Sequence, residues 1–330
     1  MRIAIVKLSA LGDIVHAMVV LQFIKEFNKE ILIDWFVEES YKELLEFHPH
    51  LNKVHIVNIK QAKKQKSLVI LNKEFKKIRK LPRYDLVIDM QGLIKSAIIS
   101  KLIPSKKTLG FDKLSARERF ASIFYNKVFK FDYGSNIIER NLGIIEYALG
   151  VNVETEQIFN KSPFLYSKRK KLSVELEDLN KHIILIPGAS HNSKCYPPSK
   201  LAELTLLIDA NFYIVWGSQK ERAMAQEIKE ISNKVIICNK LKLDELILFV
   251  SNVDLVIGPD TGPTHISWAL NIPSITLFGP TPGYRNTYET SINKVIESES
   301  KVNPYRINKN DYSIKNINVQ QISKIAQELL

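Results

Sequence analysis

Residues 255–270 read LVIGPDTGPTHISWAL and join a short apolar run, a polar turn and a second apolar segment. The run at 255–258 is of β type and predicts a buried strand, whereas residues 265–270 predict a helix. Gly262 and Pro263 stand where this helix would begin, a position that proline favours. The stretch therefore predicts one strand–turn–helix unit of an α/β domain.

The same alternation of β-type runs and helix-period segments extends along the chain. We expect strands at residues 3–7, 31–37, 54–57, 86–90 and 108–111, and again at 183–187, 212–216, 235–238, 255–258 and 275–278. A length of 330 residues fits two domains at roughly 150 residues each. The pattern predicts two Rossmann-like, doubly wound parallel-sheet domains in tandem, joined within the charged stretch 161–181.

The charge is unevenly distributed. Lys and Arg number 47 against 35 Asp and Glu, a net charge of +12. Residues 1–150 hold 26 basic and 16 acidic side chains, whereas the remainder holds 21 and 19. The positive front half indicates a polyanionic partner, which composition leaves open between nucleic acid, an anionic membrane surface and an acidic substrate.

Cysteine usage and hydropathy indicate the compartment. Cys195 and Cys238 lie far apart without C-x-x-C spacing, so we expect neither a zinc site nor a disulfide framework. The apolar core of the first residues is too short for a signal peptide, and no later apolar run is long enough to span a bilayer. We expect a soluble cytoplasmic protein with at most peripheral membrane contact.

The first strand-to-helix loop, residues 7–13, reads KLSALGD. Its one glycine does not make the dinucleotide fingerprint G-x-G-x-x-G, which argues against an NAD-linked oxidoreductase. Asp13 has two interpretations, a helix N-cap or a general base at the mouth of a cleft.

Two further loops have the composition of an anion site. Gly188 and Ser190 suit a loop that faces a phosphate, and Lys194 is either its cation or a plain surface charge. In the loop at 258–265, the free amides of a helix N-terminus after Gly262 form a diphosphate seat. His265 is then a ligand contact or a structural histidine.

Other stretches are less specific. The loop at 278–283 is a rigid turn that could close over the leaving-group side of a ligand. No D-x-D and no P-loop motif occurs, so we expect no metal site, and a diphosphate leaving group would depend on helix amides and cations.

A basic run spans residues 60–83, with ten basic residues and one acidic residue, Glu74. Leu68, Leu71, Phe75 and Ile78 recur at helical spacing, which predicts a helix with one apolar face. Its basic remainder is either a solvated face or a surface that docks on anionic lipid. No nucleic-acid-binding module accompanies it.

Together these motifs resemble the bacterial lipopolysaccharide heptosyltransferases, glycosyltransferase family nine. The resemblance rests on residues 7–13, 35–39, 89–97, 116–118, 121–126, 216–217 and 260–262 with His265. Segments VEE, QGLIKSA and ARE are most similar to the type I members, which add the first heptose. Residues 187–189 look more like the sibling that adds the second heptose, which remains an alternative.

The resemblance implies a GT-B architecture with two Rossmann-like domains. Residues 1–165 would bind the acceptor, residues 166–317 would bind the nucleotide-sugar donor, and a C-terminal helix at 318–330 would pack back on the first domain. The implied reaction is inverting, metal-independent transfer of L-glycero-D-manno-heptose from ADP-heptose to the first Kdo of Kdo-lipid A, without a cofactor. The implied partners are these substrates and the anionic inner-membrane surface, with no nucleic acid. A more distant alternative is a basic membrane or nucleic-acid binding module.

The resemblance also implies residue roles. Asp13 becomes the base, and Lys194 assists departure of the diphosphate. The implied donor-binding residues are Ala189, Ser190, Lys194, Thr261 and Gly262 at the diphosphate with His265 beside it, Glu221 at the ribose, Leu241 at the adenine and Asp260 at the sugar. The implied acceptor-binding residues are Ser9, Lys95, Arg117 and Arg119.

Overall fold

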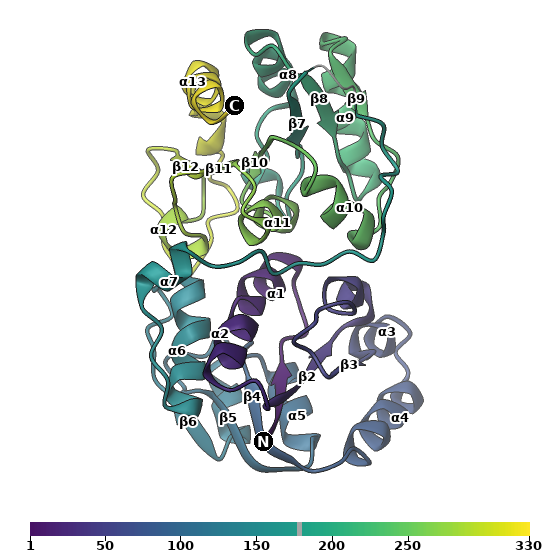
Figure 1. The fold of residues 1–330 in the computed structure, drawn as a ribbon, viewed down its shortest axis with the longest axis vertical. Helices are drawn as coiled ribbons and strands as arrows, with labels where there is room; N and C mark the ends of the chain where they lie inside the picture. Colours follow the sequence, from purple (N-terminus) through teal and green to yellow (C-terminus); the bar gives the residue numbers. More distant parts are fainter. Residues whose placement is uncertain (177–179) are drawn as a thin grey trace. The chain divides into compact units, whose positions relative to one another are not determined.

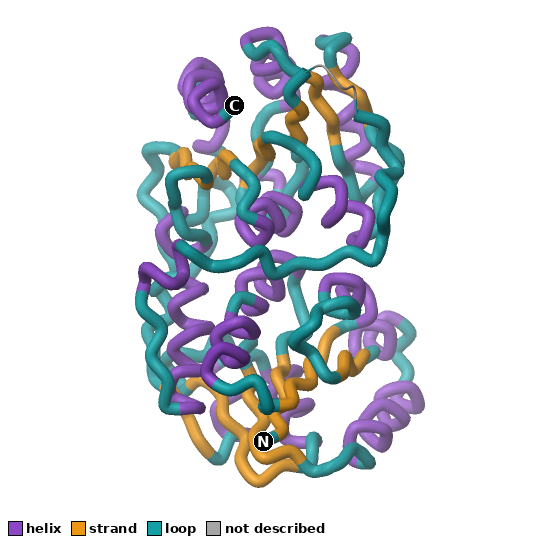
Figure 2. The backbone as a smooth tube through the Cα atoms, in the orientation of Figure 1, coloured by secondary structure: helices purple, strands orange, loops and turns teal. Residues whose placement is uncertain are grey.

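The computed structural model describes residues 1–176 and 180–330. The chain divides into two units, Met1–Phe164 and Leu165–Leu330 (Figure 1). Each unit contains one six-stranded sheet in which all neighbouring strands run parallel. Strands and helices alternate along the backbone in both units (Figure 2). The predicted α/β fold with two doubly wound parallel sheets is confirmed.

The first sheet has the strand order β3-β2-β1-β4-β5-β6. Its strands are β1 (Arg2–Val6), β2 (Leu32–Val37), β3 (Lys53–Ile56), β4 (Tyr84–Asp89), β5 (Ser105–Phe111) and β6 (Lys127–Phe129). The strand order reverses between β1 and β4, and ligands of open α/β sheets bind at the carboxyl ends of the strands at such a point. The loops after β1 and β4 therefore occupy the site-forming position of the first unit.

Helices cover both faces of the first sheet. On one face α1 (Leu11–Met18) and α2 (Val20–Phe27) pack on α6 (Ile137–Leu149). On the other, α4 (Leu68–Arg79) packs on α5 (Ile94–Leu102), over a core that includes Val6, Phe36, Ile78 and Ile99. The shorter elements are α3 (Ile59–Lys64), α7 (Thr155–Phe159) and the 3-10 helices η1 (Glu39–Leu44) and η2 (Arg119–Phe124).

The second sheet repeats this topology with the order β12-β11-β10-β7-β8-β9. Its strands are β7 (His182–Leu185), β8 (Asn211–Ile214), β9 (Val235–Ile237), β10 (Leu255–Pro259), β11 (Ser274–Phe278) and β12 (Asn293–Glu297). The order reverses between β7 and β10, so the loops after these two strands occupy the corresponding position. They are the loops in which the sequence predicts an anion site.

One face of the second sheet is covered by α8 (Pro198–Leu207), α9 (Gln219–Ile231) and α13 (Val319–Leu329). The remaining helices of the unit are α10 (Leu243–Val250), which packs on α11 (Gly262–Leu270), α12 (Gly283–Asn286), and the 3-10 helices η3 (Asn192–Lys194) and η4 (Ser313–Asn316).

The C-terminal helix, which was expected to pack back on the first unit, packs within the second unit. Helix α13 lies against α8, and Val319, Ile322 and Ala326 are buried in the core of the second unit. The Tyr196 hydroxyl donates a hydrogen bond of 2.8 Å to the carbonyl oxygen of Ile317, which fixes the approach to this helix. Its single apolar face is thus already covered within its own unit.

The basic run 60–83 was predicted to form one helix. In the structure it is divided between two helices, α3 and α4. Lys66 adopts a positive φ of 48°, and the Ser67 hydroxyl accepts a hydrogen bond from the amide of Ile70 as the N-cap of α4. Because α4 begins at Leu68, the side chains of Leu68 and Val69 face solvent, and each is 79% exposed. Leu68 therefore does not belong to the buried apolar face that the spacing predicts.

Two other observations bear on the sequence-based expectations. Cys195 and Cys238 are free thiols. Within residues 1–176 and 180–330, no helix is both long enough and apolar enough to cross a membrane.

Candidate active site

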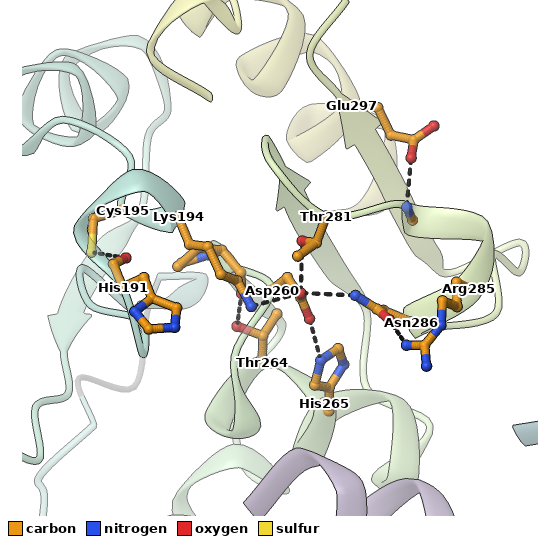
Figure 3. A network of polar contacts seen from close by, with 12 residues as sticks. His191, Lys194, Cys195, Asp260, Thr264, His265, Thr281, Arg285, Asn286 and Glu297 are labelled. Atoms are coloured by element: carbon orange, nitrogen blue, oxygen red, sulfur yellow. Dashed lines mark hydrogen bonds and ion pairs between the residues drawn. The ribbon is translucent and has the colours of Figure 1, made fainter. Parts of the chain in front are cut away.

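Asp260 is the centre of the polar network in the second unit (Figure 3). Its Oδ2 accepts hydrogen bonds from Lys194 Nζ at 2.7 Å, Thr281 Oγ1 at 2.8 Å and Asn286 Nδ2 at 3.1 Å. Its Oδ1 lies 3.0 Å from Nε2 of His265. Burial alone would raise the pKa of Asp260, but Lys194 and His265 outweigh burial and hold the pKa well below its usual range. Asp260 is therefore a charged carboxylate.

The donors around Asp260 are unevenly shared between its two oxygens. Each carboxylate oxygen has about two lone-pair sites, so the three donors at Oδ2 engage that oxygen fully, whereas His265 alone faces Oδ1. Oδ1 therefore keeps acceptor capacity for one further donor, such as the sugar hydroxyl that the family resemblance implies. Because Asp260 is ionised, the His265 nitrogen that faces it carries a proton and donates.

Lys194 is not a plain surface charge. It lies in η3, in the loop after β7, and it is buried together with its ion-pair partner. Figure 3 shows its ammonium group at the Asp260 carboxylate, where the loops after β7 and β10 meet. The structure thus joins three of the predicted donor residues, Lys194, Asp260 and His265.

Helix α11, whose N-terminus is the predicted anion seat, begins one residue earlier than expected, because Gly262 is already helical and Thr261 is the N-cap. The Thr264 hydroxyl donates to the carbonyl oxygen of Pro259 at 2.8 Å and closes the turn. In the described part of the chain, no protein group accepts a hydrogen bond from the amides of Thr261 and Gly262. These amides and the helix dipole favour an anion next to Lys194.

Glu221 lies beside the backbone of Gly188. A Cβ atom at Gly188 would come within 2.2 Å of Glu221 Cγ, so only glycine allows this approach. Oε2 of Glu221 accepts the amides of Gly217 and Ser218 at 2.7 and 2.8 Å, as the capping box of α9. The other oxygen retains acceptor capacity for a hydroxyl group.

The remaining predicted donor residues lie in the loops after β7 and β9. Ala189 is half-buried and Ser190 is exposed in the loop after β7, and Leu241 is half-buried just before α10. Sequence reasoning missed Thr281 and Asn286. Thr281 lies in the Gly- and Pro-rich loop 278–283, which was expected to be a rigid turn that could close over the leaving-group side of a ligand, whereas nothing in the sequence indicates Asn286.

Asp13 is the predicted base in the first unit. It is the third residue of α1, so the N-cap interpretation is wrong and Ala10 holds that position. Asp13 Oδ2 accepts the amide of Ala10 at 3.2 Å, and the side chain is half-exposed. The carboxylate is therefore oriented by the helix start while it remains accessible.

Ser9 and Lys95 lie together in the first unit. Lys95 Nζ donates to Ser9 Oγ at 2.9 Å and lies 4.0 Å from the buried carboxylate of Glu38. Burial raises the pKa of Glu38, and the nearby Lys60 amide and Lys95 counteract this shift. Glu38 Oε2 also accepts the amide of Lys60 at 3.3 Å. Two predicted acceptor residues are thus adjacent, with Glu38 behind them.

Gln91 connects the loops after β1 and β4. Its Oε1 accepts the amide of Leu8 at 2.7 Å, and its Nε2 donates to Ser9 Oγ at 3.2 Å. Asp89 in turn accepts the amides of Gln91 and Gly92, at 2.8 and 3.1 Å, and the Tyr125 hydroxyl at 2.8 Å. Residues 89–97 were part of the family resemblance, but Lys95 was the one residue among them that received a role, and Asp89 and Gln91 received none.

Arg117 is exposed on the segment between β5 and η2, and Arg119 is exposed as the first residue of η2. This segment is tied to the start of α5, since the Glu118 amide donates to Gly92 O at 3.0 Å and the Glu118 carboxylate accepts the amide of Ile94 at 2.6 Å. Across the described residues, no hydrogen bond or ion pair joins either arginine to Ser9 or Lys95. Nor do three or more His, Cys, Asp or Glu side chains gather there as a metal site.

Known proteins resemble this chain over its full length. A relative named lipopolysaccharide heptosyltransferase 1 from Campylobacter coli is 40% identical over an alignment covering 100% of this chain and 99% of that protein. A lipooligosaccharide heptosyltransferase 2 from Campylobacter jejuni is 28% identical and covers 82% of this chain and 79% of that protein.

Comparison with solved structures gives the same result as comparison with related sequences. The solved structure of E. coli heptosyltransferase WaaC with ADP-2-deoxy-2-fluoro heptose has a TM-score of 0.78 at 24% identity, with both chains covered completely. This likeness confirms the GT-B class expected for the fold. The family model described as glycosyltransferase family 9 (heptosyltransferase) matches residues 73–310. With that match and the full-length relative, this chain belongs to glycosyltransferase family 9, the heptosyltransferases.

Proposed function

We propose that this chain transfers L-glycero-D-manno-heptose from ADP-heptose to the first Kdo of Kdo-lipid A, in the inner core of lipopolysaccharide. The observation that carries the proposal is the buried pair of Lys194 and Asp260 beside the open amides of α11. That arrangement suits the diphosphate of a nucleotide sugar. The Campylobacter coli relative is named lipopolysaccharide heptosyltransferase 1, and the solved structure of E. coli heptosyltransferase WaaC contains ADP-2-deoxy-2-fluoro heptose.

The chemistry is one displacement with inversion at the anomeric carbon. The acceptor hydroxyl oxygen attacks this carbon while its proton passes to the Asp13 carboxylate. The bond between the anomeric carbon and the phosphate oxygen breaks, and ADP leaves with the bonding electrons. Lys194 and the amides of Thr261 and Gly262 stabilise the charge that develops on the departing diphosphate.

The nucleoside and the acceptor have candidate contacts in different units. Glu221 takes the ribose hydroxyls with its second oxygen, and Leu241 covers the adenine. Ala189 and Ser190 approach the diphosphate from the loop after β7. On the acceptor side, Ser9 and Lys95 bind the acidic sugar, and the exposed Arg117 and Arg119 attract its carboxylate.

We propose that the reaction needs no metal ion. The sequence has no D-x-D clamp, and a lysine with helix amides supplies positive charge at the diphosphate seat. Full activity in excess EDTA supports this part, whereas loss that Mg²⁺ restores contradicts it.

A second candidate is the sibling reaction that adds the second heptose, which the Pro-Gly-Ala opening of residues 187–189 favours. The higher identity to the type 1 relative than to the type 2 relative argues for the first heptose. Incubation with ADP-heptose and Kdo-lipid A, followed by mass spectrometry of the lipid, tests both. One added heptosyl residue supports the type I reaction, whereas addition only to an already heptosylated acceptor supports the sibling.

Family membership removes an NAD-linked oxidoreductase from consideration, and the basic front half does not require nucleic acid. We propose instead that the enzyme works at the cytoplasmic face of the inner membrane as a peripheral protein. The lysines of α3 and the following turn, with the exposed Leu68 and Val69, supply charge and apolar surface for that contact.

A further inference from the structure

The 3-10 helix η2 in the first unit exposes two large apolar side chains. Phe120 and Ile123 are each 73% exposed, and Leu114 on the preceding turn is 61% exposed. Residues three apart in a 3-10 helix lie on the same side of it, so Phe120 and Ile123 share one face. None of these three side chains has a part in the proposed site.

The fold holds this face outward. On the inner side of η2, Ala121 is buried, and the Tyr125 ring fills the space beside Gly110, where a Cβ atom would lie 2.3 Å from it. The Tyr125 hydroxyl donates to buried Asp89 at 2.8 Å. The Ser122 hydroxyl bonds back to the carbonyl oxygen of Arg119 at 2.9 Å. Phe120 and Ile123 are thus presented on a turn anchored from inside.

The segment around this face carries three basic and two acidic side chains. Lys113, Arg117 and Arg119 are exposed on the same segment. The two acids are engaged by backbone amides, since Asp112 accepts from Leu114 and Ser115 at 3.2 and 2.8 Å, and Glu118 accepts from Ile94 at 2.6 Å. Exposed cations beside outward-facing apolar groups complement an anionic lipid surface.

The position of η2 places a lipid contact near the proposed acceptor residues. Glu118 connects the segment to the first turn of α5, and this turn contains Lys95, which donates to Ser9. A lipid surface seated on η2 therefore lies next to the residues that are proposed to bind the acidic sugar.

We propose that η2 is a lipid-docking ridge: Phe120 and Ile123 enter the interface of an anionic membrane while Lys113, Arg117 and Arg119 contact its phosphates. The use of this docking rests on the proposed function, because it brings a lipid-borne acceptor to the site. The docking itself is a property of the surface and is measured without catalysis.

The first experiment measures binding of the full chain to vesicles. Wild-type protein is expected to sediment with vesicles of phosphatidylethanolamine and phosphatidylglycerol but not with phosphatidylcholine vesicles. The double variant Phe120→Ser/Ile123→Ser should lose at least about tenfold in affinity for the anionic vesicles. Phe27→Ser, at a side chain 54% exposed at the end of α2, is the matched control and should bind as wild type does. All three proteins should melt at similar temperatures, because the substituted side chains are exposed.

The second experiment compares acceptors. The double variant should use an acyl-free Kdo acceptor as wild type does and should lose activity on Kdo-lipid A embedded in the anionic vesicles. The docking proposal is overturned if wild type and the double variant bind the anionic vesicles with equal affinity. It is also overturned if the wild-type protein binds neither the anionic nor the phosphatidylcholine vesicles. If wild type transfers heptose to neither acceptor, the proposed function fails, and the vesicle measurement still decides the docking.

Discussion

The ammonium of Lys194 lies 2.7 Å from the carboxylate of Asp260 and joins the loops that follow β7 and β10. These strands flank the point where the strand order of the second sheet reverses. The cation at the proposed diphosphate seat is therefore fixed before any ligand arrives. A fixed cation needs little reorganisation when charge develops on a leaving group.

Replacing Lys194 by Met should weaken both stability and donor binding. The change leaves the buried Asp260 without its cation, and breaking a buried ion pair in this way costs about 3–5 kcal/mol. Thr281→Val removes only a neutral donor from the same carboxylate and should cost about 1 kcal/mol. Thermal unfolding and ADP calorimetry measure the two effects. Wild-type ADP affinity in Lys194→Met would exclude Lys194 from the diphosphate site.

The first unit has a corresponding link across its own reversal point. Gln91, after β4, holds both the Leu8 amide and the Ser9 hydroxyl, after β1. In each unit, a side chain thus joins the two loops at which a ligand of such a sheet binds.

Gln91→Leu should therefore impair the acceptor side alone. It removes the acceptor of the Leu8 amide, which costs about 1–3 kcal/mol when a buried donor is left unpaired, and it frees Ser9 and Lys95 to move. We expect a higher KM for the acceptor with an unchanged Kd for ADP. Ser9→Ala separates the loss of one hydroxyl from the loss of loop geometry. A change in ADP affinity alone would contradict this role.

The sequence predicted the inner strands, because burial on both faces leaves a continuous hydrophobic signal. It also predicted the partly buried edge strands β3 and β9, but it missed the other two edge strands, β6 and β12. β6 is a three-residue strand, KVF, with exposed Lys127 and Val128, and β12 carries Lys294 and Glu297 within its run.

The site was predicted where one loop carries several chemical groups, as at residues 258–265. It was not predicted where a contact depends on tertiary packing. Asn286 reaches Asp260 from α12, and Gln91 reaches Ser9 from the neighbouring strand, and neither spacing is visible along the chain. The break before Ser67 was missed because the run of basic residues continues across it, although the apolar positions at helical spacing all lie after it.

Lys161 predicts a pH dependence of stability. Burial lowers its pKa to about 7 from 10.5, with the ammonium 5.5 Å from the Phe164 ring centroid. Between these two values the unfolded chain binds a proton that the folded chain does not, so stability rises with pH. Below about 7 both states are charged, and the penalty for burying the charge is present in full.

Lys161→Met should remove this rise. Urea unfolding at pH 7 and pH 10 should show a smaller gain with pH in the variant, by an amount on the order of a few kcal/mol. Lys101→Met, at an exposed lysine of the same unit, should keep the wild-type gain. Parallel pH profiles for wild type and Lys161→Met would mean that Lys161 stays charged in the fold.

Neutralising Lys63, Lys64 and Lys66 to Gln should weaken the use of membrane-embedded acceptor more than that of a short soluble acceptor. Each lysine near an anionic surface contributes about 1 kcal/mol, and salt screens that contribution. The kcat/KM for both acceptors, measured at low and high salt, tests the point. Equal losses on both acceptors would refute a membrane role for this cluster.

Asp13→Asn should abolish transfer and leave the donor site intact. The Asn carbonyl oxygen still accepts the Ala10 amide, so the start of α1 and the melting temperature should be preserved. The amide group cannot take the proton of the acceptor hydroxyl, and loss of a general base lowers the rate by about a hundred- to ten-thousandfold. ADP release with Kdo-lipid A measures the rate, and calorimetry with ADP-heptose measures binding. Near-wild-type turnover would assign the base to another group, whereas loss of both turnover and binding would place Asp13 in the architecture of the fold.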